Sequence, residues 1–260
     1  MQPVGGMDKI VSGFEHASIP EGRQVKDLVQ TNKPVQSIWV KGKTALVITE
    51  NGEYFAADYV IATLAAPLLA KLDGNFLDVE NKKTLSVVSM DAACKVAWQS
   101  KYRFWEQENR IYGGISWTKD IISQVWYPSF GFNSAIGVLV GAYNEASAAE
   151  EFQTFSRSKR LEVALNGAEK LHPGFQEKVF SKNGVSIAWA KMPYQAGGWA
   201  NGTSFTQRDI FKKLIKIDIQ DNPVLLAGDW FSYWPGWQEG ALDSAHYVTD
   251  QIHQFVAYSK

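Results

Sequence analysis

Short apolar runs separated by turn residues predict strands in the first third of the chain. Ahead of them, Asp8 is placed to cap a short helix over residues 9–14. The apolar runs are then separated by the turns Lys41-Gly42-Lys43 and Asn51-Gly52, and Asn-Gly between apolar runs is a strong signal for a β-hairpin. The apolar run 58–63 that follows is typical of a buried strand in a parallel sheet.

Helical periodicity marks three later segments. Pro67 begins a short helix that extends to residue 72, and residues 146–171 form the longest periodic segment, which Pro173 ends. The last helix starts near Glu239 and carries apolar residues along one face. Short apolar runs predict further strands, at residues 93–98, 125–127, 137–143, 185–189 and 224–227.

The alternation of strand runs with helices predicts a mixed α/β fold. The meander over residues 35–57 feeds the buried strand after it, which suggests a doubly wound sheet with a β insertion. The central stretch, residues 90–200, is predicted to form a separate domain with an antiparallel sheet.

Composition excludes several function classes. The 260 residues can bury one large core or two small ones, and a net charge of −1 gives no attraction for nucleic acid. No apolar run is long enough to predict a membrane span. The single cysteine, Cys94, and four scattered His residues predict neither a disulfide framework nor a metal site. No nucleophile-elbow motif supports Ser-His-Asp catalysis, and no feature assigns a compartment.

The start of the last helix is the strongest candidate for a ligand site. Gly236-Trp237-Gln238-Glu239-Gly240 follows a short apolar strand that ends in Gly228-Asp229. The free N–H groups and the positive end of a helix favour a negative group at this position. A flavin that becomes anionic on reduction would suit it. A plain capped helix packed on a strand explains the same residues.

Three further groups of residues could carry chemistry. Lys95 lies among apolar neighbours, where an ammonium is costly unless it has a partner or water; an edge-strand lysine that faces solvent is the alternative. Tyr143 ends an apolar strand and could donate to a carboxylate, although a lone tyrosine is commonly a core residue. Aromatic residues around two adjacent glycines form either core or a cage for an apolar substrate, at Trp189, Tyr194, Gly197, Gly198 and Trp199.

Taken together and in order, these residues resemble the flavin-containing amine oxidase superfamily, and most closely the L-amino acid oxidases. The similarity extends from about Gly6 to Val256. It includes the following segments: Gly6-Met7-Asp8-Lys9, residues 57–61, Lys95 before Phe104-Trp105-Glu106, Trp126-Tyr127-Pro128, Trp189 with Tyr194 and Gly197-Gly198, and Ala227-Gly228-Asp229 with the glycine-rich helix start. The joint order of these segments is more specific than any one of them.

The resemblance implies a role for each matching residue. Lys95 resembles the lysine that contacts flavin N5 through a water, and Tyr143 the tyrosine that hydrogen-bonds the substrate carboxylate. Trp199 and Trp237 fall where relatives place an aromatic cage or a side-chain pocket over the flavin face. The remaining matches imply contacts to FAD. Val35 would pair with adenine, Trp189 would pack along the isoalloxazine, Gly228 and Asp229 would reach the ribityl-pyrophosphate, and Gly236, Trp237, Gln238 and Glu239 would lie near flavin O2.

The resemblance also divides the chain and implies a partner. Residues 1–90 and 201–260 are expected to belong to an FAD-binding domain, and residues 91–200 to a substrate-binding domain. A Gly-x-Gly-x-x-Gly loop and the arginine that clamps the substrate carboxylate are not found in the sequence. An upstream polypeptide is expected to supply both, either as a separate processed chain or as the missing half of a truncated product, and an oligomer is expected.

The activity that the resemblance implies is FAD-dependent oxidative deamination of an L-amino acid by dioxygen, which gives a 2-oxo acid, ammonia and hydrogen peroxide. A related flavin monoamine oxidase and an amino acid 2-monooxygenase are alternatives, and a non-catalytic fragment or binding subunit is an alternative of another class. Trp199 and Trp237 would suit aromatic or long apolar substrates, but the preferred side chain cannot be read from the sequence.

Overall fold

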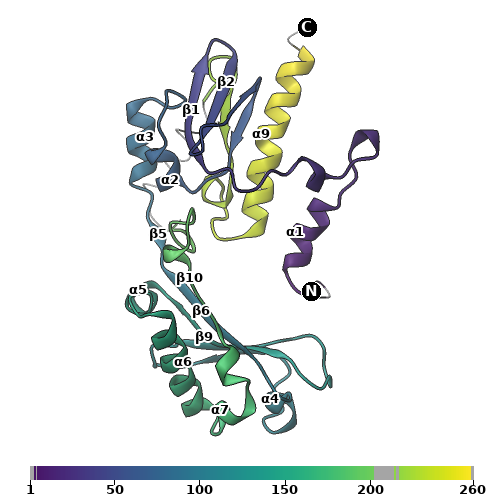
Figure 1. The fold of residues 1–260 in the computed structure, drawn as a ribbon, viewed down its shortest axis with the longest axis vertical. Helices are drawn as coiled ribbons and strands as arrows, with labels where there is room; N and C mark the ends of the chain where they lie inside the picture. The colour runs from purple at the N-terminus through teal and green to yellow at the C-terminus, as the bar shows by residue number, and fades with distance from the viewer. Residues whose placement is uncertain (1–2, 4, 202–213, 215–216, 259–260) are drawn as a thin grey trace. The chain divides into compact units, whose positions relative to one another are not determined.

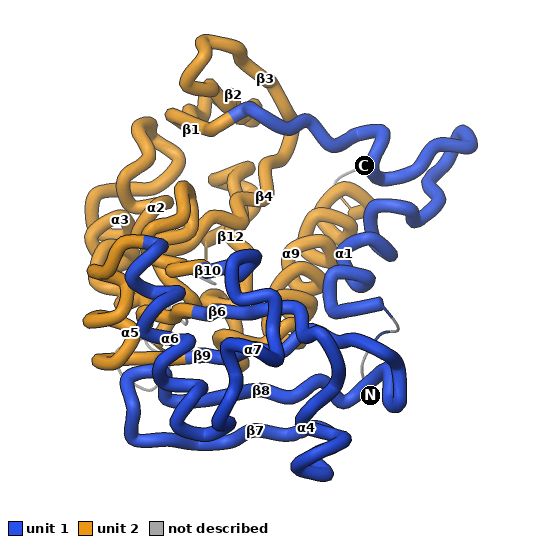
Figure 2. Tube along the Cα trace, turned by 60° about the horizontal axis from the view of Figure 1, so that its bottom comes forward, with its two compact units in different colours: residues 1–33, 95–143, 157–186 blue, residues 34–94, 144–156, 187–260 orange. Residues whose placement is uncertain are grey.

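The chain folds into two compact units, each assembled from separate stretches of sequence. The computed structural model describes residues 3, 5–201, 214 and 217–258. Unit 1 comprises residues 1–33, 95–143 and 157–186, and unit 2 comprises residues 34–94, 144–156 and 187–260 (Figure 2). The mixed α/β class predicted above is confirmed. The division into FAD-binding and substrate-binding domains stays a prediction, and residues 202–213 and 215–216 of its last segment lie outside the described residues.

Unit 2 begins with an antiparallel meander. Its strands are β1 (Val35–Lys41), β2 (Thr44–Thr49) and β3 (Tyr54–Ala57), in the order β1-β2-β3. The two predicted turns connect them, so both hairpins are confirmed. Gly42 and Gly52 have φ values of 61° and 82°, a backbone conformation that glycine adopts without steric cost. The chemistry of the turns therefore sets the register of the meander.

A parallel pair of strands joins the two ends of unit 2. Strand β4 (Val60–Ala62) pairs with β12 (Val224–Leu226), with Val60 opposite Val224. The parallel strand predicted at 58–63 is confirmed, but its burial is incomplete, because Ile61 is 37% exposed. Helices α2 (Ala66–Lys71) and α3 (Val79–Ser86) follow β4. The predicted helix at Pro67 is thus confirmed to within a residue.

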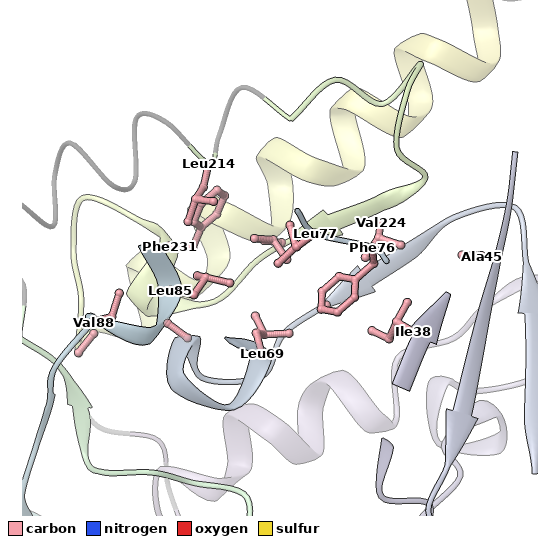
Figure 3. Packing of buried hydrophobic residues seen from close by; sticks show 14 residues of the cluster. Ile38, Ala45, Leu69, Phe76, Leu77, Leu85, Val88, Leu214, Val224 and Phe231 are labelled. Atoms are coloured by element: carbon pink, nitrogen blue, oxygen red, sulfur yellow. The ribbon is translucent and has the colours of Figure 1, made fainter. Parts of the chain in front are cut away.

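The core of unit 2 lies around this strand pair (Figure 3). Leu69, Phe76 and Leu85 are fully buried and pack with Ile38 of the meander and Val224 of β12. Burying a side chain of this size stabilises the fold by about 1.5–3 kcal/mol. The core therefore fixes the ends of β4 and β12 relative to each other.

The remaining described elements of unit 2 lie beyond residue 89. Strands β5 (Met90–Asp91) and β11 (Trp199–Ala200) form an antiparallel pair. The helices are α5 (Ala146–Phe152), the short 3-10 helices η4 (Trp189–Lys191) and η5 (Asp229–Phe231), and the long α9 (Gln238–Tyr258). The predicted last helix is confirmed. Along it Val248 is buried whereas Leu242 is 41% exposed, so only part of the predicted apolar face is covered.

Unit 1 contains the first helix of the chain and a five-stranded sheet. Helix α1 (Asp8–Glu15) confirms the helix expected at 9–14, and the 3-10 helices η1 (Pro20–Gly22) and η2 (Val25–Leu28) follow. The predicted cap is wrong, because Asp8 is already helical and Met7 is the N-cap, with no side-chain capping bond. Asp8 still places a negative charge in the first turn, where the helix dipole favours it.

The sheet of unit 1 has the strand order β10-β6-β9-β8-β7 (Figure 2), and its strands β10, β6 and β9 are also labelled in Figure 1. Its strands are β6 (Ala93–Gln99), β7 (Gly114–Trp117), β8 (Gln124–Tyr127), β9 (Val138–Glu145) and β10 (Val185–Ala188). The pairs β7–β8 and β8–β9 are antiparallel, which confirms the antiparallel character predicted for the central stretch. After α1, η1 and η2, the further helices of the unit are α4 (Phe104–Gln107), α6 (Arg157–Leu171), α7 (Phe175–Lys178) and the 3-10 helix η3 (Ser181–Asn183).

The two faces of this sheet differ in cover. On one face Trp98 packs edge-on against Phe175, with ring centroids 5.7 Å apart, and Ile122 lies against α6 at Gly167. The other face carries Lys95 and Trp126, both exposed. A sheet with one buried and one open face shows this alternation of inward and outward residues.

The single helix predicted over residues 146–171 is wrong, because α5 and α6 are separate. The backbone N–H groups of Thr154 and Phe155 donate to the carbonyls three residues earlier, and the Thr154 hydroxyl also donates to the Glu151 carbonyl, at 2.7 Å. Such tightened turns end an α-helix. The apolar spacing continues through the break, so periodicity alone does not reveal it.

Candidate functional site

A pocket of about 270 Å³ lies within unit 2 at the carboxyl ends of β4 and β12. Residues just after each strand line it, and the crevice outside the carboxyl ends of parallel strands is the usual ligand position in open α/β sheets. Its lining residues are Thr63, Leu64, Ala65, Met90, Tyr194, Gln195, Gly197, Gly198, Trp199, Asp229 and Trp230. The glycines, Tyr194, Trp199 and Asp229 were predicted from the sequence, whereas residues 63–65, Met90, Gln195 and Trp230 were not.

Trp230 ties the two strand ends together. Its indole Nε1 donates to the Leu64 carbonyl at 3.0 Å. Gly228, the residue after the strand tip, has φ +141°, and a Cβ at this position would lie 2.8 Å from Trp230 Nε1. Ser244 of α9 holds both backbone groups of Gly228, with its hydroxyl 2.9 Å from the N and 3.0 Å from the O. Gly228 is therefore required by the close approach of the surrounding groups.

The predicted helix start and strand tip meet at the pocket. The Asp229 carboxylate accepts a hydrogen bond from the Gly236 backbone N–H at 2.8 Å. A Cβ at Gly236 would lie 3.3 Å from Trp199 Cγ, and the Trp199 indole donates to the Asp91 carboxylate at 3.1 Å. The structure thus brings Trp199 to Asp229 and Gly236, which follow it by 30 and 37 residues in the sequence.

The first turn of α9 presents polar groups to its surroundings. Trp237 is 67% exposed, and Gln238 and Glu239 are also exposed. The first backbone N–H groups of an α-helix lack partners within the helix, which gives this end a partial positive charge. Gly240, one turn in, is buried against Ser232 and the Trp234 carbonyl. The segment 232–234 thereby holds the helix start in place.

Two predicted FAD contacts lie elsewhere in unit 2. Val35 is the first residue of β1, half-buried opposite Thr49, next to an irregularity in the register. Trp189 is half-buried and begins η4, so the strand predicted to include it ends at Ala188. Neither residue lines the pocket described above.

Lys95 and Tyr143 lie together in unit 1. The Lys95 ammonium is 4.4 Å from the centroid of the Tyr143 ring, within the range of a cation–π interaction. Lys95 is exposed, as in the solvent-facing alternative, but it is on β6, which is an inner strand of the sheet. The third member of this group is Trp126, whose ring centroid is 5.5 Å from that of Tyr143. No role was predicted for Trp126.

A buried polar network supports the other side of unit 1. Arg103 forms an ion pair with Glu106, and its hydrogen bond holds the pKa of this carboxyl below its usual range. The Tyr127 hydroxyl lies 2.6 Å from His172 Nε2. Burial lowers the pKa of His172 and raises that of Tyr127. Both pairs are largely shielded from water, so their arrangement contributes to stability.

The described residues contain no group of three or more His, Cys, Asp or Glu side chains placed to hold a metal ion. None of the helices traced there combines the length and apolar character that crossing a membrane requires.

Comparison with known proteins decides the family. The model of the family described as flavin containing amine oxidoreductase matches residues 1–253. The chain belongs to this family. The resemblance seen in the sequence is therefore confirmed, and FAD is the cofactor of these oxidases.

Curated relatives are amino acid oxidases. A flavin-dependent L-tryptophan oxidase from Lentzea aerocolonigenes is 26% identical over 250 residues, which cover 93% of this chain and 50% of that protein. An L-amino-acid oxidase from Siganus canaliculatus is 29% identical over 201 residues, covering 76% of this chain and 37% of that protein. The chain therefore spans half the length, or less, of these two relatives.

Solved structures share the fold. A putrescine oxidase bound to putrescine superposes with a TM-score of 0.72 at 17% identity, covering 96% of this chain and 53% of that one. Cyclohexylamine oxidase from Brevibacterium oxydans superposes with a TM-score of 0.71 at 13% identity, covering 88% and 50%. The arrangement of the elements described above is thus that of the amine oxidases.

The residues of unit 2 suit part of a flavin. Trp199 and Trp230 provide flat apolar surface, and Asp229 and the start of α9 provide one acceptor and several N–H donors. A volume of about 270 Å³ is at the small end for a cofactor pocket, so it can enclose one portion of FAD but not the whole molecule.

Proposed function

We propose that this chain supplies part of an FAD-dependent L-amino acid oxidase. The reaction converts an L-amino acid, dioxygen and water into a 2-oxo acid, ammonia and hydrogen peroxide. The observation that carries the proposal is the assembly of Trp199, Asp229 and Gly236 at the carboxyl ends of β4 and β12, in a chain whose curated relatives are named as oxidases of L-amino acids.

Unit 2 is assigned to the cofactor. Asp229 fixes the loop before α9, and the helix start then offers its N–H groups and partial positive charge to a group that becomes anionic. Preorganised dipoles of this kind stabilise developing charge without reorganisation. Trp189, Trp237, Gln238, Glu239, Gly228 and Val35 are assigned to FAD by the family resemblance. FAD, when bound, supplies the two-electron chemistry, since it accepts a hydride equivalent and is reoxidised by dioxygen.

Unit 1 is assigned to the substrate. The Tyr143 hydroxyl would donate to the amino acid carboxylate, and Lys95, 4.4 Å from the Tyr143 ring, adds positive charge beside it. A substrate carboxylate is attracted by both the Tyr143 hydroxyl and the Lys95 ammonium, whereas a plain amine has no negative group for the ammonium to attract. This favours an amino acid over a simple amine as substrate. Lys95 would also hold the water that assists electron transfer to dioxygen.

Further polypeptide is part of the proposal. The Gly-x-Gly-x-x-Gly loop and a carboxylate-binding arginine would come from sequence upstream of this chain or from another chain, and an oligomer would hold them together. The substrates would be a small-molecule L-amino acid and dioxygen.

Product analysis tests the activity. The protein is isolated with its flavin and supplied with each proteinogenic L-amino acid, for which 2-oxo acid, ammonia and peroxide are measured, and in separate assays with simple amines. Equal amounts of the three products are expected. A carboxamide with little peroxide would identify an amino acid 2-monooxygenase, and oxidation of simple amines alone would identify a monoamine oxidase. Absence of flavin absorbance would contradict the cofactor assignment and favour a binding subunit.

Stopped-flow kinetics tests Lys95 with a matched control. Lys95→Met is expected to slow flavin reduction or reoxidation by at least about tenfold. This lower bound is smaller than the roughly 100- to 10,000-fold that a positioned proton-transfer group usually contributes. Lys101→Met removes an exposed lysine just beyond the same strand and should leave both rates unchanged. Equal rates in both variants and the wild type would remove the role assigned to Lys95.

A further inference from the structure

Trp126 completes a row of three side chains across the sheet of unit 1. Strand β9 lies between β6 and β8, and Tyr143 on β9 contacts the Lys95 ammonium of β6 at 4.4 Å and the Trp126 indole of β8 at 5.5 Å. The rings of Tyr143 and Trp126 are inclined by 59°. Tyr143 is thus held by contacts from both neighbouring strands.

The Trp126 indole is itself fixed in orientation. Its Nε1 donates to the Gln124 side-chain carbonyl at 2.7 Å, and Gln124 is only 4% exposed. Trp126 is also set in register, opposite Ile115 of β7 and Val140 of β9. An exposed tryptophan with a buried hydrogen-bond partner loses little conformational entropy when it supports another ring, because its rotamer is already set.

We infer that Trp126 is a positioning residue for Tyr143, and that it sets the direction in which the phenol hydroxyl meets the substrate carboxylate. The inference rests on the proposed function, because it needs Tyr143 to bind the substrate. Trp126 acts through the Tyr143 ring. Its loss should therefore weaken substrate binding without greatly changing the chemical step.

Steady-state kinetics with the L-amino acid that the wild type oxidises fastest tests this. Trp126→Leu is expected to raise KM about three- to tenfold, the size of a lost aromatic pair, with kcat within about twofold. Trp126→Phe keeps a ring at this position and should restore most of the affinity. In a Tyr143→Phe background, Trp126→Leu should add nothing further, because residues that act through one contact are not additive.

Trp117→Leu is the matched control. Trp117 is 70% exposed on the neighbouring strand β7, and none of the described aromatic residues forms a ring pair with it. KM should be unchanged in this variant. A raised KM in Trp117→Leu would show that losing any exposed tryptophan from unit 1 weakens substrate binding.

A second readout does not need turnover. The whole protein is labelled with 3-fluorotyrosine, and the ¹⁹F resonance of residue 143 is assigned by its disappearance in Tyr143→Phe. Trp126→Leu should shift this resonance and Trp117→Leu should not. An unshifted resonance would overturn the inference whatever the kinetics show.

The outcomes separate the two proposals. The role of Trp126 alone is overturned if the wild type deaminates amino acids but Trp126→Leu leaves KM unchanged. It is also overturned if Trp126→Leu raises KM by the same factor in the Tyr143→Phe background as in the wild type. An unchanged KM in Tyr143→Phe contradicts the carboxylate contact and with it this inference. A wild type that makes no 2-oxo acid contradicts the proposed function itself.

Discussion

Gly240 provides a sharp test of the helix start in unit 2. A Cβ at this position would lie closer than 3.0 Å to the Ser232 hydroxyl and to the Trp234 carbonyl. Ser232 cannot turn away without cost, because its hydroxyl donates to the Asp229 carbonyl and accepts from the Trp234 N–H, at 2.6 and 3.0 Å. The Trp234 oxygen is main chain, so Gly240→Ala must displace either this loop or the first turn of α9.

The expected magnitude follows from these contacts. Overpacking of one methyl group typically costs about 1–3 kcal/mol, and each hydrogen bond lost adds roughly 0.5–1.5 kcal/mol. Gly240→Ala should therefore lower the free energy of unfolding by about 2–4 kcal/mol. Since Asp229 anchors the same loop to Gly236, the displacement should also reduce retention of FAD.

Gly13→Ala is the control for this experiment. Gly13 is in helix α1, and a Cβ there would meet nothing within 4 Å. The change should be neutral or stabilise the protein by up to about 1 kcal/mol, through helix propensity. Urea unfolding and flavin absorbance after desalting are measured for both variants. If Gly240→Ala unfolds and retains flavin as Gly13→Ala does, the proposed close packing of the helix start is refuted.

Two further predictions concern the buried network of unit 1. Arg103→Met should lower the free energy of unfolding at neutral pH by about 3–5 kcal/mol, because the Glu106 carboxylate stays buried without its main partner. Adding Glu106→Gln to this variant should recover much of the lost stability in urea titrations. A double variant no more stable than Arg103→Met would contradict the reasoning. His172 has a pKa below the usual 6.5 because of burial, so its contribution to stability is complete above pH 6.5 and is lost as the pH falls toward the lowered value. The urea concentration at the unfolding midpoint should therefore decrease as the pH is lowered from 7.5 to 5.5, and it should decrease less in His172→Gln. Identical pH profiles of the two proteins would contradict the role of His172.

Much of unit 2 could be predicted because its signals are local. The turn at Asn51-Gly52 needs only adjacent residues to specify the hairpin, and Gly236 and Gly240 mark the start of the last helix in the same way. The joining of Asp229 to Gly236 follows from a short loop. The α/β class and the family were therefore readable from the sequence alone.

Other features depend on contacts between distant residues. Residues 63–65 line the pocket only because β4 pairs with β12, and no local pattern specifies that pairing. The break between α5 and α6 comes from two hydrogen bonds in residues that are compatible with a helix. Trp126 belongs to a segment that carries the family resemblance, but its role could not be predicted, because an outward-facing aromatic residue in a strand has the same pattern whether or not it supports a neighbour.

The β4–β12 pair has a consequence for how the protein is made. The two strands lie more than 160 residues apart in the sequence, and the strands β6 to β10 are synthesised between them. Pairing across so long a stretch of chain is slow to form, since its entropic cost must be met before the contacts stabilise it. On the ribosome, the inserted sheet can complete itself while β4 still lacks its neighbour, so binding of a cofactor to the pocket has to wait until residues 224–230 have emerged.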